Sequence, residues 1–181
     1  KLGNRSNASS EIEYDETWAR RVGAEGEGVR TIIAMVHHTR LDAAVSAAAI
    51  MRSAVVEALH HTRHREAFGA VLADQPLMQN VLADLALETE AATAMVMRLA
   101  RGFDDATADP ALAPMVRLAT AITKFEICKR APTVVAEAME CLGGGGYVED
   151  GPMPRYFREA PVNGIWEGTG NVICLDILRT I

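Results

Sequence analysis

A long stretch of regularly spaced side chains after Gly26 and Gly28 is the feature that most restricts the fold of this 181-residue chain. Up to about Glu66, mainly apolar and small residues recur every three or four positions, which places them on one face of an α-helix. The stripe consists of Ile33, Val36, Arg40, Ala44, Ala47, Met51, Val55 and Ala58. A helix of that length would reach roughly 55 Å.

A second helix is predicted after the Phe68-Gly69 pair that closes the first. Asp74 is a good N-cap residue, and Pro76 suits the first turn of a helix. Its apolar stripe consists of Met78, Val81, Leu82, Leu85, Ala92, Val96 and Leu99, and Gly102 is expected to end the helix.

A third helix is predicted to start near Pro110 and Pro114. Its stripe is Met115, Leu118, Ile122, Phe125, Val135, Ala138 and Leu142. Pro132 lies within it and removes a helical hydrogen bond, so a kink is expected. A short helical turn over 152–158 and a last helix from about Gly170 complete the pattern.

These segments predict an all-α, up-and-down helical bundle, preceded by a short extended segment over residues 1–25. Hydrophobic residues make up 49% of the chain and aromatic residues only 5%. This balance favours closely packed helices over a sheet. The chain begins without Met and stops within an apolar periodic segment, so we expect a piece of a longer protein.

Charge and composition argue against several kinds of partner. The net charge is −6 and no basic stripe is visible, which gives little support for nucleic-acid binding by this segment. No apolar run was expected to reach the roughly 18–20 residues of a membrane span, and no signal peptide is visible. Cys128, Cys141 and Cys174 lack metal or redox spacing, so each is expected to be a small buried residue in a reducing, cytoplasmic compartment.

Glu167 is the first candidate for chemistry. It follows Ile165 and Trp166, precedes Gly168, and lies about twenty residues after a four-glycine run at 143–146 that would let backbone approach a bulky ligand. Burial beside an aromatic ring would suit a general base. The alternative is a carboxylate in the first turn of a helix, where it complements the dipole.

Basic residues near the end of the first long helix form a second candidate. Arg63 and Arg65 precede the Phe68-Gly69 pair and could hold a diphosphate through their planar guanidinium groups. The alternative is a cationic helix end, which the dipole favours by itself. His60, His61 and His64 are expected on a solvated helix face, and we expect no metal site; His37 and His38 are interpreted in the same way.

Two ordered motifs resemble the C-terminal signatures of the acyl-CoA dehydrogenase family. The first is Arg65 to Gly69 followed by Gln75 and Leu82 to Asp84. The second is Gly143 to Tyr147, then Arg155, Arg158 to Ala160 and Ile165 to Thr169. Three segments are similar in sequence to the alkylation-response (AidB-like) branch of the family: Glu140 to Leu142, Pro161 to Gly168 and Gly3 to Glu11.

The resemblance implies that residues 26–181 form the C-terminal helical bundle domain of an FAD-binding flavoprotein. Residues 1–25 would then be the tail of a missing middle β domain and its linker. An acyl-CoA thioester or a related substrate and a homotetramer are implied as well.

The resemblance also implies roles for residues around the predicted base. Glu167 matches the carboxylate that removes the α-proton of the acyl-CoA. Thr39 matches the position where one subgroup carries its base instead. Arg40 would order the wall of the active site, and Trp166 replaces the more usual Tyr and would narrow the acyl channel.

Further positions match residues that contact the flavin. Arg65 and Phe68 match contacts made across a subunit interface, and Gly144 lies in the matching glycine loop. Thr169 matches a flavin-contacting position after the base. Glu140 stands where many members carry Gln, and a carboxylate there would repel a diphosphate unless an arginine such as Arg65 paired with it.

Three functions remain open at this point. The first is an FAD-dependent acyl-CoA dehydrogenase, of which this piece alone is expected to be inactive. The second is an AidB-like flavoprotein of the DNA alkylation response, with weak dehydrogenase activity and DNA binding through a region outside this chain. The third is a helical oligomerisation domain without chemistry of its own.

Overall fold

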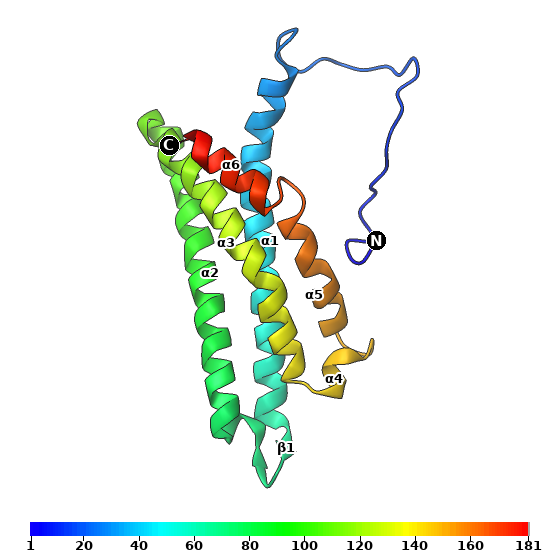
Figure 1. Ribbon diagram of the computed structural model, residues 1–181, viewed down its shortest axis with the longest axis vertical. Helices are drawn as coiled ribbons and strands as arrows, with labels where there is room; N and C mark the ends of the chain where they lie inside the picture. The colour runs from blue at the N-terminus through cyan, green and yellow to red at the C-terminus, as the bar shows by residue number, and fades with distance from the viewer. Residues whose placement is uncertain (181) are drawn as a thin grey trace.

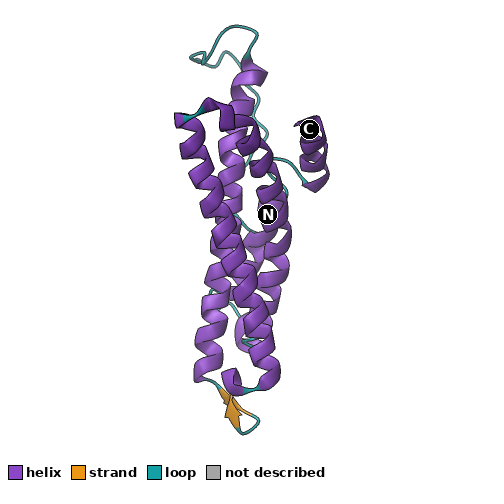
Figure 2. Cartoon of the chain, turned by 90° about the vertical axis from the view of Figure 1, so that its left-hand side faces the viewer, coloured by secondary structure: helices purple, strands orange, loops and turns teal. Residues whose placement is uncertain are grey.

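The computed structural model describes residues 1–180 and is built around three long helices that run side by side (Figures 1 and 2). These are α1 (Gly28–His64), α2 (Pro76–Ala108) and α3 (Ala113–Glu140). The prediction of an all-α bundle is confirmed.

A small hairpin, absent from the sequence prediction, connects α1 to α2. It comprises β1 (Glu66–Ala67) and β2 (Ala70–Val71), and a 3-10 turn, η1 (Leu72–Asp74), follows it. Phe68 and Gly69 have φ values of 55° and 83°, as a two-residue turn between twisted antiparallel strands requires. The expected N-cap at Asp74 is wrong, because Asp74 lies in the 3-10 turn and α2 begins at Pro76.

The core lies where α1 crosses α3 and α2. Ala44, Ala47 and Met51 are fully buried on α1, as the periodicity predicts. Small side chains allow the helix backbones to approach closely, which explains why the stripe is rich in alanine. The early part of the predicted stripe does not reach the core, since Ile33 is 57% exposed.

The face of α3 that is buried differs from the face that the sequence predicts. Met115 and Ile122, expected inside, are 48% and 42% exposed. The N-terminal half of α3 instead buries Val116, Thr120 and Lys124. Pro132 lies inside α3 as expected, and the helix continues beyond it to Glu140.

The C-terminal third of the chain returns along α3. It forms α4 (Gly144–Tyr147), α5 (Met153–Glu159), η3 (Ala160–Gly164) and α6 (Gly170–Thr180). A further 3-10 turn, η2 (Pro110–Leu112), precedes α3. The segments η3 and α6 both contact α3, so the loop between them, residues 165–169, is held against the bundle.

The first 25 residues contain neither helix nor strand and form an arc away from the bundle (Figure 1). The N-terminal end of this arc contacts the bundle, where the backbone N–H of Asn4 donates to Oε2 of Glu159 on α5 over 2.8 Å. The assignment of this segment to a β domain and linker stays a prediction.

Two sequence expectations need correction. Cys128 and Cys141 are buried, but Cys174 on α6 is exposed. By length and composition alone, α1 is also long and apolar enough to span a bilayer, contrary to the expectation that no segment would be. Much of its apolar character is explained by the alanine stripe, which packs against α2 and α3.

Candidate active site

The loop between η3 and α6 has an unusual backbone conformation. Glu167 and Gly168 follow one another with φ values of 59° and 106°, both in the left-handed region. A glycine adopts this conformation easily, whereas a glutamate does so only when its surroundings hold it there. The conformation of Glu167 therefore points to specific contacts around the loop.

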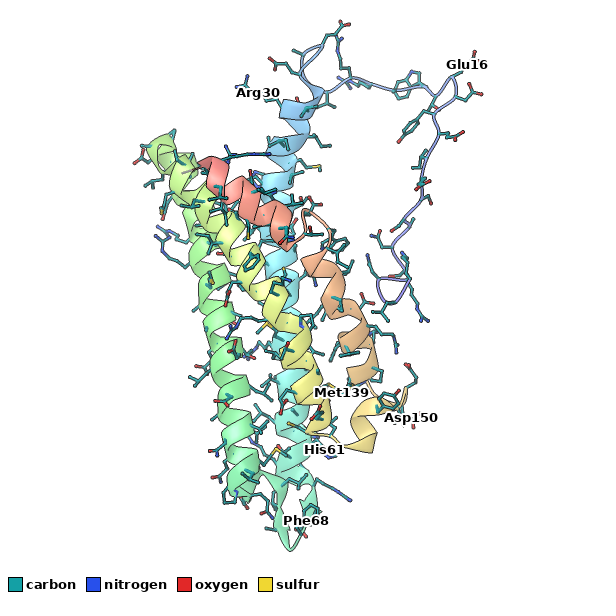
Figure 3. All side chains as sticks on the ribbon, viewed as in Figure 1. Glu16, Arg30, His61, Phe68, Met139 and Asp150 are labelled. Carbon is teal, nitrogen blue, oxygen red and sulfur yellow. The ribbon has the colours of Figure 1, made fainter. Side chains whose placement is uncertain are left out.

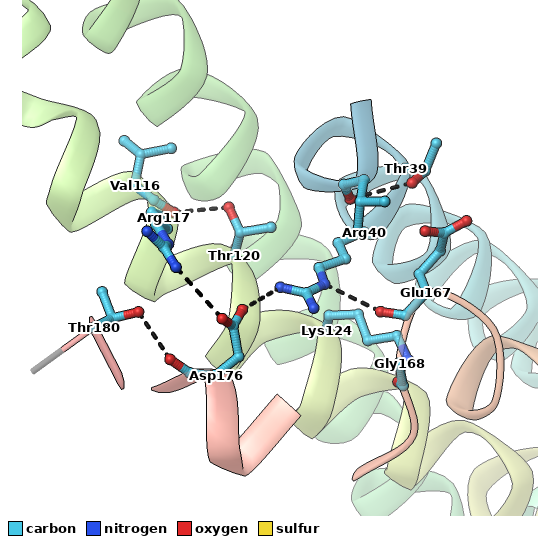
Figure 4. Close-up of polar contacts among 11 residues, drawn as sticks. Thr39, Arg40, Val116, Arg117, Thr120, Lys124, Glu167, Gly168, Asp176 and Thr180 are labelled. Atoms are coloured by element: carbon cyan, nitrogen blue, oxygen red, sulfur yellow. Dashed lines mark hydrogen bonds and ion pairs between the residues drawn. The ribbon is translucent and has the colours of Figure 1, made fainter. Parts of the chain in front are cut away.

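Two cationic side chains from different helices supply those contacts (Figure 4). Nε of Arg40, on α1, donates to the backbone oxygen of Glu167 over 3.1 Å. Nζ of Lys124, on α3, donates to the backbone oxygen of Gly168 over 2.6 Å. Hydrogen bonds from charged donors are stronger than neutral ones, so two successive carbonyl groups are each fixed by a cation from a different helix.

An ion pair in turn holds Arg40 in place. Nη1 of Arg40 lies 2.5 Å from Oδ2 of Asp176 on α6, and both side chains are largely buried. Arg117 approaches the other carboxylate oxygen at 3.4 Å. The hydrogen bond from Arg40, together with the charges of both arginines, holds the pKa of Asp176 below its usual range although partial burial acts in the opposite direction.

Lys124, which binds the same loop, is almost completely buried, with only 1% of its surface exposed. Burial lowers the pKa of its ammonium group, and the neighbouring charge of Arg40 lowers it further. The negative charge of Glu167 acts in the opposite direction and favours the charged form.

The side chain of Glu167 is free of these contacts. Figure 4 shows its carboxylate on the side of the loop near Thr39, directed away from the Arg40 and Lys124 head groups. Among residues 1–180 it has no hydrogen-bond partner, and it is half-buried. A carboxylate with free lone pairs on a fixed backbone can accept a proton from a bound molecule.

The alternative role for Glu167, a carboxylate in the first turn of a helix, does not fit the structure. The helix α6 begins at Gly170, three residues later, and the left-handed backbone of Glu167 lies outside it. The adjacent Trp166 borders a groove of about 380 Å³ that Ser46 and Ile50 of α1 also line.

The predicted cofactor residues form a second group at the other end of the bundle. Phe68 is 96% exposed at the hairpin tip, beside the exposed Arg65. Figure 3 places Phe68 and Met139, near the end of α3, at the same end of the molecule. Glu140 ends α3 there, and a Cβ atom added at Gly144 would meet nothing within 4 Å.

The two groups are well separated within one chain. Lys124, which binds the loop of Glu167, and Glu140, whose backbone oxygen accepts from Gly143, lie 16 residues apart on α3. That spacing corresponds to roughly 24 Å along the helix axis. Within a single chain, the glycine run and the carboxylate of Glu167 therefore do not line one pocket, while Thr169, Arg40 and Trp166 lie with Glu167.

The histidines occupy different surroundings. His37 packs its ring against Phe103 with 4.8 Å between ring centroids, so its half-buried position corrects the expectation of a solvated face. Burial lowers its pKa, and the charges of His38 and Arg40 act in the same direction. Within residues 1–180, no group of three metal-binding side chains is present.

Sequence analysis missed Lys124 and Asp176. A signal was available for Lys124, since it lies four residues from Thr120 and from Cys128 on the face of α3 that is otherwise uncharged. A lone charge on such a face is rarely buried without a partner. Nothing local marks Asp176, because its partners come from α1 and α3.

The bundle and the loop that carries Glu167 correspond to one class of protein. The acyl-CoA dehydrogenase C-terminal domain family matches residues 26–181, and the chain belongs to this family.

Individual relatives agree with this assignment. The chain is 50% identical over 181 residues to the putative acyl-CoA dehydrogenase AidB of Escherichia coli K12, covering all of this chain and 33% of the relative. It is 36% identical to acyl-CoA dehydrogenase family member 11 of Caenorhabditis elegans, covering 99% of this chain and 30% of the relative. The chain thus spans about a third of the length of these relatives.

Solved structures show the same fold. The crystal structure of Caenorhabditis elegans ACDH-11 in complex with C11-CoA superposes with a TM-score of 0.84 at 36% identity, over 88% of this chain and 28% of that one. Butyryl-CoA dehydrogenase from Megasphaera elsdenii superposes with a TM-score of 0.77 at 28% identity, over 87% of this chain and 39% of that one.

Proposed function

We propose that this domain belongs to an FAD-dependent oxidoreductase that acts on acyl-CoA thioesters, and that Glu167 is its catalytic base. The observation that carries the proposal is the fixed left-handed backbone of Glu167, which holds a carboxylate without hydrogen-bond partners beside Thr39. A relative of the same fold is described in complex with C11-CoA, which supports an acyl-CoA as the substrate class.

Each residue of the site then has a defined task. The carboxylate of Glu167 takes a proton from the α-carbon of the thioester, while Arg40 holds the backbone of that residue. Trp166 borders the nearby groove and would narrow the channel for the acyl chain. Bound FAD supplies the chemistry of hydride acceptance, and the protein supplies orientation and a proton acceptor.

The residues at the far end of the bundle fit the diphosphate and adenosine portion of FAD. The exposed guanidinium of Arg65 can bind phosphate oxygens, Phe68 offers a free aromatic face, and the open backbone at Gly144 allows close approach. Glu140 is exposed, and among the described residues no ion pair joins it to Arg65.

The roughly 24 Å between the two groups supports a homo-oligomer, in line with the tetramer expected from the sequence. In such an assembly, Glu167 and Thr169 of one subunit would face the flavin ring. Arg65 and Phe68 of a neighbouring subunit would hold the other end of the same cofactor. We place the assembled protein in the cytoplasm.

The test uses the full-length protein loaded with FAD. Under anaerobic conditions, a panel of acyl-CoA thioesters should bleach the flavin absorbance of the parent protein. Glu167→Gln should retain the oxidised flavin spectrum and lose bleaching by at least about 1,000-fold, since a neutral amide cannot accept the proton. Bleaching of this variant at the parent rate would remove Glu167 from the role.

A second candidate is an alkylation-response flavoprotein with weak dehydrogenase activity. The 50% identity to the Escherichia coli AidB protein over the whole chain favours it. DNA contact would come from a region outside this chain, because residues 1–181 carry a net charge of −6. Slow bleaching with every thioester, combined with salt-sensitive DNA binding by the full-length protein, would support this function over the first.

A further inference from the structure

Lys124 is the only charged residue among residues 1–180 that is almost completely buried, at 1% exposure. The other buried polar side chains belong to threonines and to Asn163. Removing an ammonium group from water is costly, so its position in the protein requires a compensating partner. The partner that the structure provides is the backbone oxygen of Gly168, at 2.6 Å.

The position of that oxygen is informative. Gly168 directly follows Glu167, and its φ of 106° lies in a region that only glycine adopts freely. A glycine at this point gives the chain freedom just beyond the base. The hydrogen bond from Arg40 restrains the peptide group before Gly168, and the hydrogen bond from Lys124 restrains the peptide group after it.

We propose that Lys124 is a positioning residue, which fixes the peptide group after Gly168 and thereby holds the carboxylate of Glu167 at the substrate. Lys124 itself does not touch the substrate, since its head group lies beneath the loop on the side opposite to that carboxylate (Figure 4). This role rests on the proposed function of Glu167, but the restraint on the loop can be measured without any activity.

The geometry around Lys124 fits a hydrogen-bond donor, since its Nζ lies 2.6 Å from the backbone oxygen of Gly168. Burial and the charge of Arg40 on α1 lower the pKa of Lys124, whereas the charge of Glu167 on the loop favours the ammonium form. Burial raises the pKa of the Cys128 thiol to about 11, so this neighbour remains protonated near neutral pH.

The first measurement is hydrogen exchange of the FAD-loaded full-length protein. The amides of Ile165 and Trp166 donate to Val162 at 2.9 and 3.1 Å, and the amide of Ile173 donates to Thr169 at 3.0 Å, so they report on both sides of the loop. Lys124→Met keeps the length of the side chain and removes the donor. Exchange at these amides should accelerate about 10- to 100-fold, the range expected when one charge-assisted hydrogen bond is lost.

Two variants serve as controls. Lys124→Arg keeps a charged donor and should restore most of the protection. Arg101→Met removes a cationic donor from the exposed surface of α2, away from the loop, and should leave exchange at these amides unchanged. If Lys124→Met does not fold, Lys124→Gln, which stays polar but is shorter and uncharged, should give the same acceleration.

The second measurement is flavin bleaching by an acyl-CoA that the parent protein oxidises. The rate at saturating thioester should fall at least about tenfold in Lys124→Met, with the half-saturating concentration within about twofold of the parent and partial recovery in Lys124→Arg. Parent-like exchange and a parent-like rate in Lys124→Met would overturn the positioning role. If none of the thioesters bleached the flavin of the parent protein, only the proposed function would be refuted. The exchange experiment would still decide the role of Lys124.

Discussion

Replacing Asp176 with Asn should break the ion pair that holds Arg40 at the candidate active site. The exposure of the two side chains sets lower and upper limits for the resulting loss of stability. The carboxylate lies 2.5 Å from Arg40, and the two side chains are 14% (Arg40) and 23% (Asp176) exposed. Breaking a fully buried ion pair costs about 3–5 kcal/mol, whereas an exposed pair contributes about 0.2–1 kcal/mol. For a pair of intermediate exposure we expect Asp176→Asn to lower the free energy of unfolding by about 1.5–3 kcal/mol.

The effect should depend on pH in a defined direction. The hydrogen bond from Arg40, assisted by Arg117, holds the pKa of Asp176 below its usual range in the folded chain. A carboxylate with a lowered pKa stabilises the fold fully above its unfolded pKa of about 3.9, and this contribution is lost as pH falls through the folded pKa. The difference between parent and Asp176→Asn should therefore be constant from pH 6 to 8 and shrink below about pH 4.

The assay is urea-induced unfolding of the 181-residue chain, followed by helical circular dichroism at several pH values. Asp105→Asn is the matched control, since Asp105 pairs with Arg101 over 2.8 Å on the surface of α2 and the arginine is 72% exposed. Asp105→Asn should lower the free energy of unfolding by no more than about 0.5 kcal/mol. Equal costs for the two variants at pH 7, or a cost for Asp176→Asn that persists unchanged at pH 3, would refute the reasoning.

Two further predictions concern the core and the thiols. Met51→Ala should lower the free energy of unfolding by about 2–4 kcal/mol, because Met51 is fully buried between the long helices, while Met97→Ala, at a position 65% exposed, should stay within about 0.5 kcal/mol in the same urea titration. A thiol-reactive dye at pH 7.5 should label Cys174 first, since burial raises the pKa of Cys128 and that of Cys141 to about 11; mass spectrometry showing equal labelling of all three in the folded chain would contradict this.

The helices themselves were largely predictable from the sequence. The spacing of Ala44, Ala47 and Met51 indicated one long helix with a small-residue face, and these residues do form the core. The ordered motifs around Arg65 and Glu167 indicated the family, which the comparison confirms. Such features are local, because a helix requires only that neighbouring residues share a favourable period and suitable ends.

The rotation of α3 was not predictable in the same way. Periodicity shows which residues share a face, but it does not show which face is buried. Met115 and Ile122 lie on one face of α3, and Val116 and Thr120 lie on the adjacent face. The face that becomes buried depends on which neighbours pack there. In this protein α1, η3 and α6 all contact α3, and they cover the face that carries Lys124.

The sequence by itself therefore determined that three long helices form, the small-residue contact between them and the family to which the chain belongs, although α2 continues past the predicted end at Gly102 to Ala108. Only the tertiary structure decided that Glu167 lies far from the glycine run and that Arg40 and Lys124 hold consecutive peptide groups of its loop. The reason is that a backbone carbonyl is the same acceptor at every position. Which cation reaches it is set by the distances between helices far apart in the sequence.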